Sequence, residues 1–166
     1  MFSVKIIKTD DHSVDLIDIF ALYRSCEVVA YNKLNFISSI NVQKDSLILS
    51  PKDSGTPDDL FECPIKFARL KLKSVRSLTK VEIRSIFSMV FNTNDKCEII
   101  NTEISFQCES GDRYLELSFD EGYFGILASV KGIAYRFNTL AHINAFLIKN
   151  KYDIFRLIKN GYAIPL

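Results

Sequence analysis

Hydrophobic positions recur at helical spacing in three segments of the chain. In the first, polar residues at 10–13 are typical of a helix start, and the apolar positions after them predict a helix over residues 14–33. A break in the pattern at residues 24–25 leaves a second interpretation open, in which residues 27–31 begin a strand.

The second and third helices have clearer start signals. Thr79–Glu82 has the sequence of a capping box, in which the first and fourth side chains bond each other's free backbone N–H, and apolar residues follow at 83–90. Asn138 or Thr139 begins the third helix, whose apolar stripe covers residues 140–158 and which residues 150–151 kink or divide in two.

Three further segments have the alternation or length of strands. Phe2–Ile7 alternates, and Ser46–Ser50 is a short apolar run of strand length. Ile65–Val75 alternates with a slip of one residue, which a β-bulge near Ala68 would explain.

The region from residue 98 to residue 137 has the pattern of a β-meander. Four β-rich runs are separated by the turn-forming residues Ser-Gly-Asp, Asp-Glu-Gly and Lys-Gly. The runs are Glu98–Cys108, Arg113–Phe119, Tyr123–Val130 and Ile133–Phe137. Leu115, Leu117 and Phe119 alternate with polar residues, so one face is packed and the other is at least partly hydrated. We therefore expect an α+β fold, with an antiparallel β-meander sheet and helices packed on one face.

We expect residues 1–166 to form a single domain. A length of 166 residues is usual for one domain and is enough to bury a core without disulfides or a structural metal. Three of the four prolines, with several acidic residues, gather at residues 50–64, which predicts an exposed Pro/Asp-rich loop.

Charge is unevenly distributed although the net charge is only +1. Cations dominate residues 66–84, carboxylates dominate residues 95–121, and cations dominate again from residue 131. These groups could neutralise one another after folding, or the acidic meander could steer a basic partner. The basic segment could form a nucleic-acid patch, but few aromatic residues accompany it and the net charge is low, so nucleic acid is an unlikely partner.

Candidate chemistry is sparse. No phosphate-binding glycine loop, zinc-protease helix or serine-hydrolase motif is present, and the four cysteines include no CxxC pair. The cysteines are expected to be buried and reduced, with a pairing of Cys97 and Cys108 across a hairpin left open. A nucleophile pair of His142 with a cysteine has no local support, and His12 lies in a polar run. These features favour a protein that is not an enzyme and uses no cofactor or metal.

The chain has neither an apolar run of spanning length nor a signal-peptide pattern at its first residues. We therefore expect a cytoplasmic protein with no membrane association.

One part of the chain resembles a known class. Residues 114–127, continuing through Tyr135 to Phe146-Leu-Ile-Lys, combine an acidic strand, a further strand and an amphipathic helix. This combination resembles, in style, the bacterial toxin-immunity proteins of contact-dependent growth inhibition. The resemblance implies a protein that neutralises a cognate toxin, often a nuclease, by covering its active site or substrate path.

The leading hypothesis is thus an immunity or inhibitor protein, an antitoxin that binds a basic toxin domain through an acidic sheet face. Two alternatives remain open: a structural or regulatory subunit of an assembly, and a small enzyme of unrecognised type acting on nucleotides or nucleic acid. The residues expected to bind the partner are the acidic and tyrosine side chains of the meander. They are Glu103, Glu109, Asp112, Tyr114, Glu116, Asp120, Glu121 and Tyr123.

Overall fold

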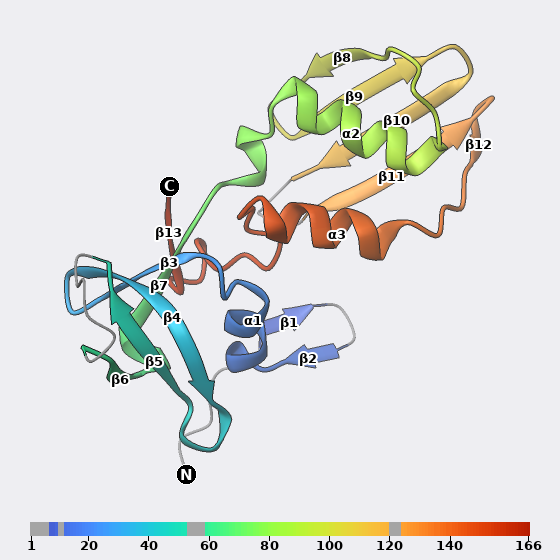
Figure 1. Cartoon of the computed structure of the whole chain (residues 1–166). Helices are drawn as coiled ribbons and strands as arrows, with labels where there is room; N and C mark the ends of the chain where they lie inside the picture. Colours follow the sequence, from blue (N-terminus) through green and yellow to red (C-terminus); the bar gives the residue numbers. More distant parts are fainter. Residues whose placement is uncertain (1–6, 10–11, 53–58, 120–123) are drawn as a thin grey trace. The chain divides into compact units, whose positions relative to one another are not determined.

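The computed structural model describes residues 7–9, 12–52, 59–119 and 124–166. The chain forms two compact units (Figure 1). The discontinuous unit combines Met1–Lys73 with Leu157–Leu166, and the inserted unit comprises Ser74–Arg156. Helices and mostly antiparallel sheets make up the chain, which confirms the α+β class. The organisation of 1–166 as one domain stays a prediction.

A six-stranded sheet forms most of the discontinuous unit. In sheet order its strands are β13 (Ala163–Pro165), β7 (Ala68–Leu72), β3 (Glu27–Ala30), β4 (Lys33–Asn41), β5 (Ser46–Pro51) and β6 (Phe61–Pro64). All neighbours are antiparallel except β13 and β7, which are parallel. The unit also contains α1 (Leu16–Leu22) and a small sheet of β1 (Ile7–Thr9) and β2 (His12–Val14).

The long helix predicted over residues 14–33 is wrong, and the strand alternative is confirmed. Helix α1 ends at Leu22, and β3 turns directly into β4 through Tyr31 and Asn32. These two residues have φ angles of 50° and 60°, the left-handed values that a two-residue hairpin turn requires. The turn therefore depends on a left-handed conformation that a tyrosine at position 31 does not predict.

Of the other predictions for the strands, one is confirmed, one is wrong and others lie partly outside the described residues. Ser46–Ser50 is confirmed as β5, whereas Phe2–Ile7 lies outside the described residues except for Ile7. The predicted bulge near Ala68 is wrong, because a 3₁₀ turn at Ile65–Phe67 precedes β7 and causes the slip in the apolar pattern. Both ends of the predicted loop at 50–64 lie in strands, β5 and β6, and its residues 53–58 lie outside the described part.

The inserted unit is the predicted meander with helices on one face (Figure 1). Its five strands follow one another across the sheet in chain order. They are β8 (Glu98–Asn101), β9 (Ser105–Ser110), β10 (Arg113–Ser118), β11 (Gly125–Val130) and β12 (Ile133–Ala134). Helices α2 (Lys80–Phe91) and α3 (Leu140–Lys149) cover one face and bury Ile86, Phe87, Ile143 and Leu147 in the shared core.

The capping box that begins α2 is confirmed. Glu82 N–H donates to Thr79 Oγ1 at 3.3 Å, and Thr79 N–H donates to Glu82 Oε2 at 2.9 Å. The buried Tyr152 hydroxyl donates to the same carboxylate oxygen at 2.8 Å. The cap of α2 is therefore also the attachment point for the chain that follows α3.

The third helix is shorter than predicted. Helix α3 ends at Lys149, and residues 154–158 form turns instead of continuing its apolar stripe. Lys151 has a φ angle of 66°, and the N–H of Tyr152 donates to the Leu147 carbonyl at 2.9 Å. This left-handed residue stops the helix. Beyond these turns the chain pairs as β13, a strand that the sequence pattern did not predict.

Candidate protein interface

The alternation of β10 separates the two faces of the inserted unit's sheet. Leu115 and Leu117 are fully buried under the helices, opposite Cys108 and Phe106 of β9. Tyr114, Glu116 and Ser118 alternate with them and lie on the other face, partly exposed. We call the helix-covered side the core face and the other side the open face.

The open face carries two rows of side chains that the strand register aligns. The first row contains Glu98, Glu109, Tyr114, Ser129 and Ala134, and the second contains Ile100, Gln107, Glu116 and Leu127. Ile100 and Leu127 are 47% and 55% exposed, so the acidic groups lie among accessible apolar ones. In strands β8–β12, all of which the structure describes, no lysine or arginine occupies an open-face position.

Carboxylates are close neighbours on this face. Glu98 is directly opposite Glu109, a like-charge cross-strand pair that costs stability. Tyr114, opposite Glu109, donates its hydroxyl to Glu116 Oε2 at 3.2 Å. Burial is the largest cause that raises the pKa of Tyr114, and the Glu116 and Glu109 carboxylates raise it further. The tyrosine therefore remains a neutral hydrogen-bond donor between two anions.

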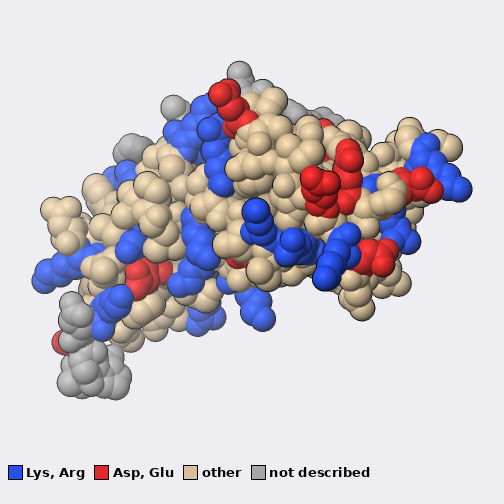
Figure 2. Space-filling model, turned by 90° about the horizontal axis from the view of Figure 1, so that it is seen from above, with Lys and Arg blue, Asp and Glu red and all other residues tan. Residues whose placement is uncertain are grey.

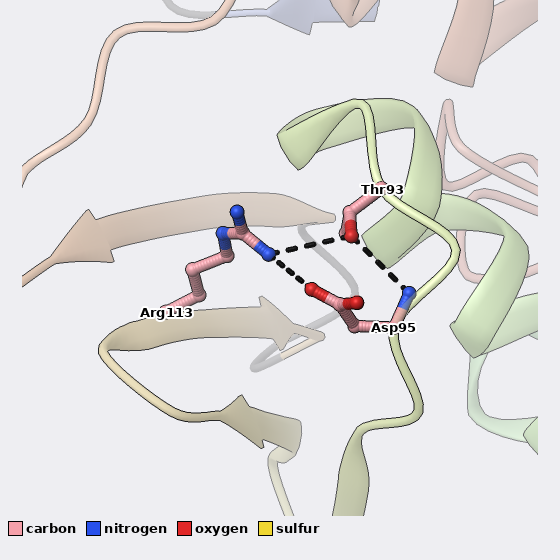
Figure 3. Close-up of polar contacts among 3 residues, drawn as sticks. All are labelled: Thr93, Asp95 and Arg113. Atoms are coloured by element: carbon pink, nitrogen blue, oxygen red, sulfur yellow. Dashed lines mark hydrogen bonds and ion pairs between the residues drawn. The ribbon is translucent and has the colours of Figure 1, made fainter.

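The one cation of these strands is held away from the open face. Arg113 shares the alternation of Leu115 and donates to Thr93 Oγ1 at 3.3 Å and to the Asp95 carboxylate (Figure 3). The Asp95 N–H donates to the same Thr93 oxygen at 3.2 Å. Hydrogen bonding with Thr93 and then Arg113 lowers the pKa of Asp95. Arg113 is thus neutralised by a partner outside the sheet and supplies no counterion to the open-face carboxylates.

The structure brings together three of the predicted partner-binding residues. Glu109, Tyr114 and Glu116 share the open face. Glu103 lies in the turn between β8 and β9, and Asp112 lies in the turn between β9 and β10, so they sit at opposite ends of the sheet. The others, Asp120, Glu121 and Tyr123, lie outside the described residues.

Glu98, Ile100 and Leu127 were missing from the predicted set. The sequence pattern treated residues 98–108 as one strand, whereas a turn at residues 102–104 divides them. This turn contains no glycine. Its Thr102 hydroxyl instead accepts hydrogen bonds from the N–H groups of Ile104 and Ser105, at 3.4 and 2.9 Å. The signal was therefore a single threonine at the start of Thr-Glu-Ile-Ser.

On the side of the molecule seen in Figure 2, acidic and basic groups are largely intermixed. Figure 2 shows most carboxylates on the side in view with lysines or arginines beside them. The basic segment 66–84 is divided between the units, because Lys66–Lys73 belong to the discontinuous unit and Arg76–Arg84 to the inserted unit. Lys71 pairs with Glu27 at 3.4 Å, and the Arg69 guanidinium donates to two backbone carbonyls. This segment does not form one continuous basic patch within either unit.

The four cysteines are poorly placed to react. All four cysteines are buried and free, and burial followed by the influence of Cys97 raises the pKa of Cys108 to about 12. A thiol with that pKa stays protonated and is a poor nucleophile. His142 is exposed in the first turn of α3, and His12 lies in β2. Among the described residues no group of histidine, cysteine and acidic side chains could hold a metal ion.

No helix in the described part of the chain has the length and apolar content needed to cross a membrane. Comparison with family models, curated proteins and solved structures found no match to this chain.

Proposed function

We propose that this chain is a protein-binding module whose open face docks on a basic protein partner. The observation that carries the proposal is a sheet face with Glu98, Glu109 and Glu116 and no cation at any open-face strand position. Exposed Ile100 and Leu127 supply apolar area in the same rows. Interfaces of this kind combine a desolvated apolar centre with complementary charge.

The energetics favour binding over a purely structural role for these residues. Glu98 and Glu109 repel each other across adjacent strands, and folding alone gains nothing from that arrangement. Lysine or arginine side chains from a partner would convert the repulsion into charge-assisted hydrogen bonds. The negative electrostatic potential of these carboxylates would also speed encounter with a basic surface.

The class of partner that fits best is a toxin domain that acts on nucleic acid, with this chain as its immunity or inhibitor protein. Surfaces that bind nucleic acid carry lysines and arginines to neutralise phosphates. An acidic sheet face complements such a surface and would compete with the substrate for it. Bacterial origin and action as an antitoxin are parts of the same proposal.

Two charge-matched double variants test the proposed interface. Glu109→Gln/Glu116→Gln removes two open-face carboxylates, and Glu103→Gln/Asp112→Asn removes two carboxylates from the turns. A partner is first captured from the native host with the wild-type chain and purified, and its affinity is then measured for all three proteins at low and high salt. We expect the open-face variant to weaken binding at least tenfold, with little effect of the turn variant and a marked salt dependence.

Equal losses in both variants would show that net charge matters and not the open face. Unchanged affinity in both would place the interface elsewhere. The immunity role has a separate readout, because the captured partner should arrest growth when it is produced alone and be harmless when it is produced with this chain. A partner that is harmless alone would refute the immunity role and leave the binding proposal standing.

A further inference from the structure

The four outer strands of the two larger sheets differ in how well they are protected against pairing with another chain. In the discontinuous unit, β6 ends in Pro64 and β13 ends in Pro165, and proline at an edge blocks further pairing. In the inserted unit, β12 has only two residues. The remaining outer strand, β8, has four residues and no proline.

The backbone of β8 leaves specific groups facing outwards. The Thr102 N–H donates to the Ser105 carbonyl at 2.9 Å and thereby sets the first hydrogen-bonded pair of the β8–β9 hairpin. Hydrogen-bonded and non-hydrogen-bonded pairs alternate in an antiparallel ladder. Ile100 and Glu98 therefore bond to β9, while the N–H and C=O groups of Ile99 and Asn101 point to the open edge. No other described strand pairs with this edge.

We infer that the partner binds by adding an extended basic segment as a sixth strand beside β8. This inference rests on the proposed function, since it uses the same open face. A strand added there would place alternate side chains in line with the two open-face rows. A basic side chain would lie opposite Glu98 and near Glu109, and an apolar one, two residues away in the added strand, would lie opposite Ile100.

A second copy of this chain is a poorer occupant of the edge. Antiparallel pairing of two β8 strands about a twofold axis keeps both open faces on the same side of the joined sheet. The joined face would carry six carboxylates, three from each copy, and no lysine or arginine at its strand positions. Like charges gathered in this way oppose association, whereas a basic segment relieves them.

The test uses a blocked synthetic heptapeptide that alternates lysine and valine on one face and has threonine on the other. Binding to the full chain is followed by NMR, together with hydrogen exchange of the Ile99 and Asn101 amides. We expect the bound peptide to slow exchange of these two amides at least tenfold and to leave the inward-bonded Ile100 amide almost unchanged. A matched peptide with glutamate in place of lysine should not bind.

A backbone variant separates strand addition from charge attraction. Asn101→Pro removes one outward N–H and should weaken peptide binding about tenfold, while Asn101→Ala, which keeps that N–H, reports the contribution of the side chain. Absence of peptide binding, unprotected amides in the wild-type complex, or a stable dimer through β8 in light scattering would each overturn the inference. If Glu109→Gln/Glu116→Gln still weakens partner binding at least tenfold in any of these cases, the proposed function survives and only the strand addition fails.

Discussion

The two faces of the inserted unit's sheet arise from the same alternation and carry opposite chemistry. On the core face, Leu115 and Leu117 pack against Cys108 and Phe106 under two helices. On the open face, the residues between them are Tyr114 and Glu116. Folding requires apolar side chains at the first set of positions and is nearly indifferent to the second. The open face is consequently the place where residue choice can report binding instead of packing.

The largest expected contrast comes from truncating neighbouring residues on the two faces. Leu115→Ala should lower the free energy of unfolding by about 2–5 kcal/mol, because it leaves a cavity in a fully packed layer. Glu116→Ala should change it by only about 0.5 kcal/mol. Urea denaturation of both variants measures the difference. Equal costs would mean that the open face is also part of the fold's stabilising structure.

A second contrast removes one hydroxyl from each face. Tyr152→Phe deletes a buried donor to Glu82 on the helix side, and hydrogen bonds to charged groups contribute about 1.5–3 kcal/mol. Tyr114→Phe deletes a partly exposed donor to Glu116 and should cost about 0.5 kcal/mol. Thermal unfolding of the two variants gives the comparison. A larger loss for Tyr114→Phe would indicate that the open-face network stabilises the fold.

Neutralising one open-face carboxylate should stabilise the fold, whereas the substitutions above destabilise it. Glu109→Gln removes the repulsion with Glu98 and should raise the free energy of unfolding by about 0.2–1 kcal/mol. The gain should shrink at high salt, because salt screens exposed charges. Glu103→Gln, in the turn, serves as the control with little expected change. Destabilisation by Glu109→Gln would show that this carboxylate makes a favourable intramolecular contact and weaken the case for a binding role.

The smallest expected effect concerns acid stability at the edge of the core face. Because Thr93 and Arg113 lower the pKa of Asp95 below its ordinary 3.8, the carboxylate stabilises the fold above that value. This contribution is lost as the pH falls through the lowered pKa, since the unfolded chain takes up the proton first. Asp95→Asn should therefore flatten the dependence of unfolding free energy on pH below about 4. An unchanged slope would mean that Asp95 and Arg113 do not interact in solution.

Sequence patterns predicted best the elements whose signals are local. The capping box at Thr79–Glu82 located the start of α2, and the glycines at 111 and 132 located two meander turns. The end of α1 and the β3–β4 hairpin were harder, because Tyr31 and Asn32 adopt left-handed angles without a glycine. Strand β13 was missed because its partner β7 lies about ninety residues earlier, so its pairing has no local signal.

The composition of the open face was predictable to the same extent as its strands. Alternation within β10 was sufficient to place Tyr114 and Glu116 on a face opposite the leucines. Glu98 and Ile100 required the register between β8 and β9, which depends on a turn stabilised by the Thr102 side chain. The confinement of Arg113 by Asp95 and Thr93 depends on a contact across eighteen residues that no spacing rule predicts.

The pairing of β13 with β7 has a consequence for the order in which the chain can fold. During synthesis, Ser74–Arg156 is made before Leu157–Leu166, which completes the discontinuous unit. The inserted unit can thus acquire its core while the other sheet still lacks its final strand. Until residues 163–165 arrive, β7 presents an unpaired edge, and unpaired edges are where nascent chains aggregate. Pairing of residues 163–165 with β7 therefore closes an edge that would otherwise remain open to other chains.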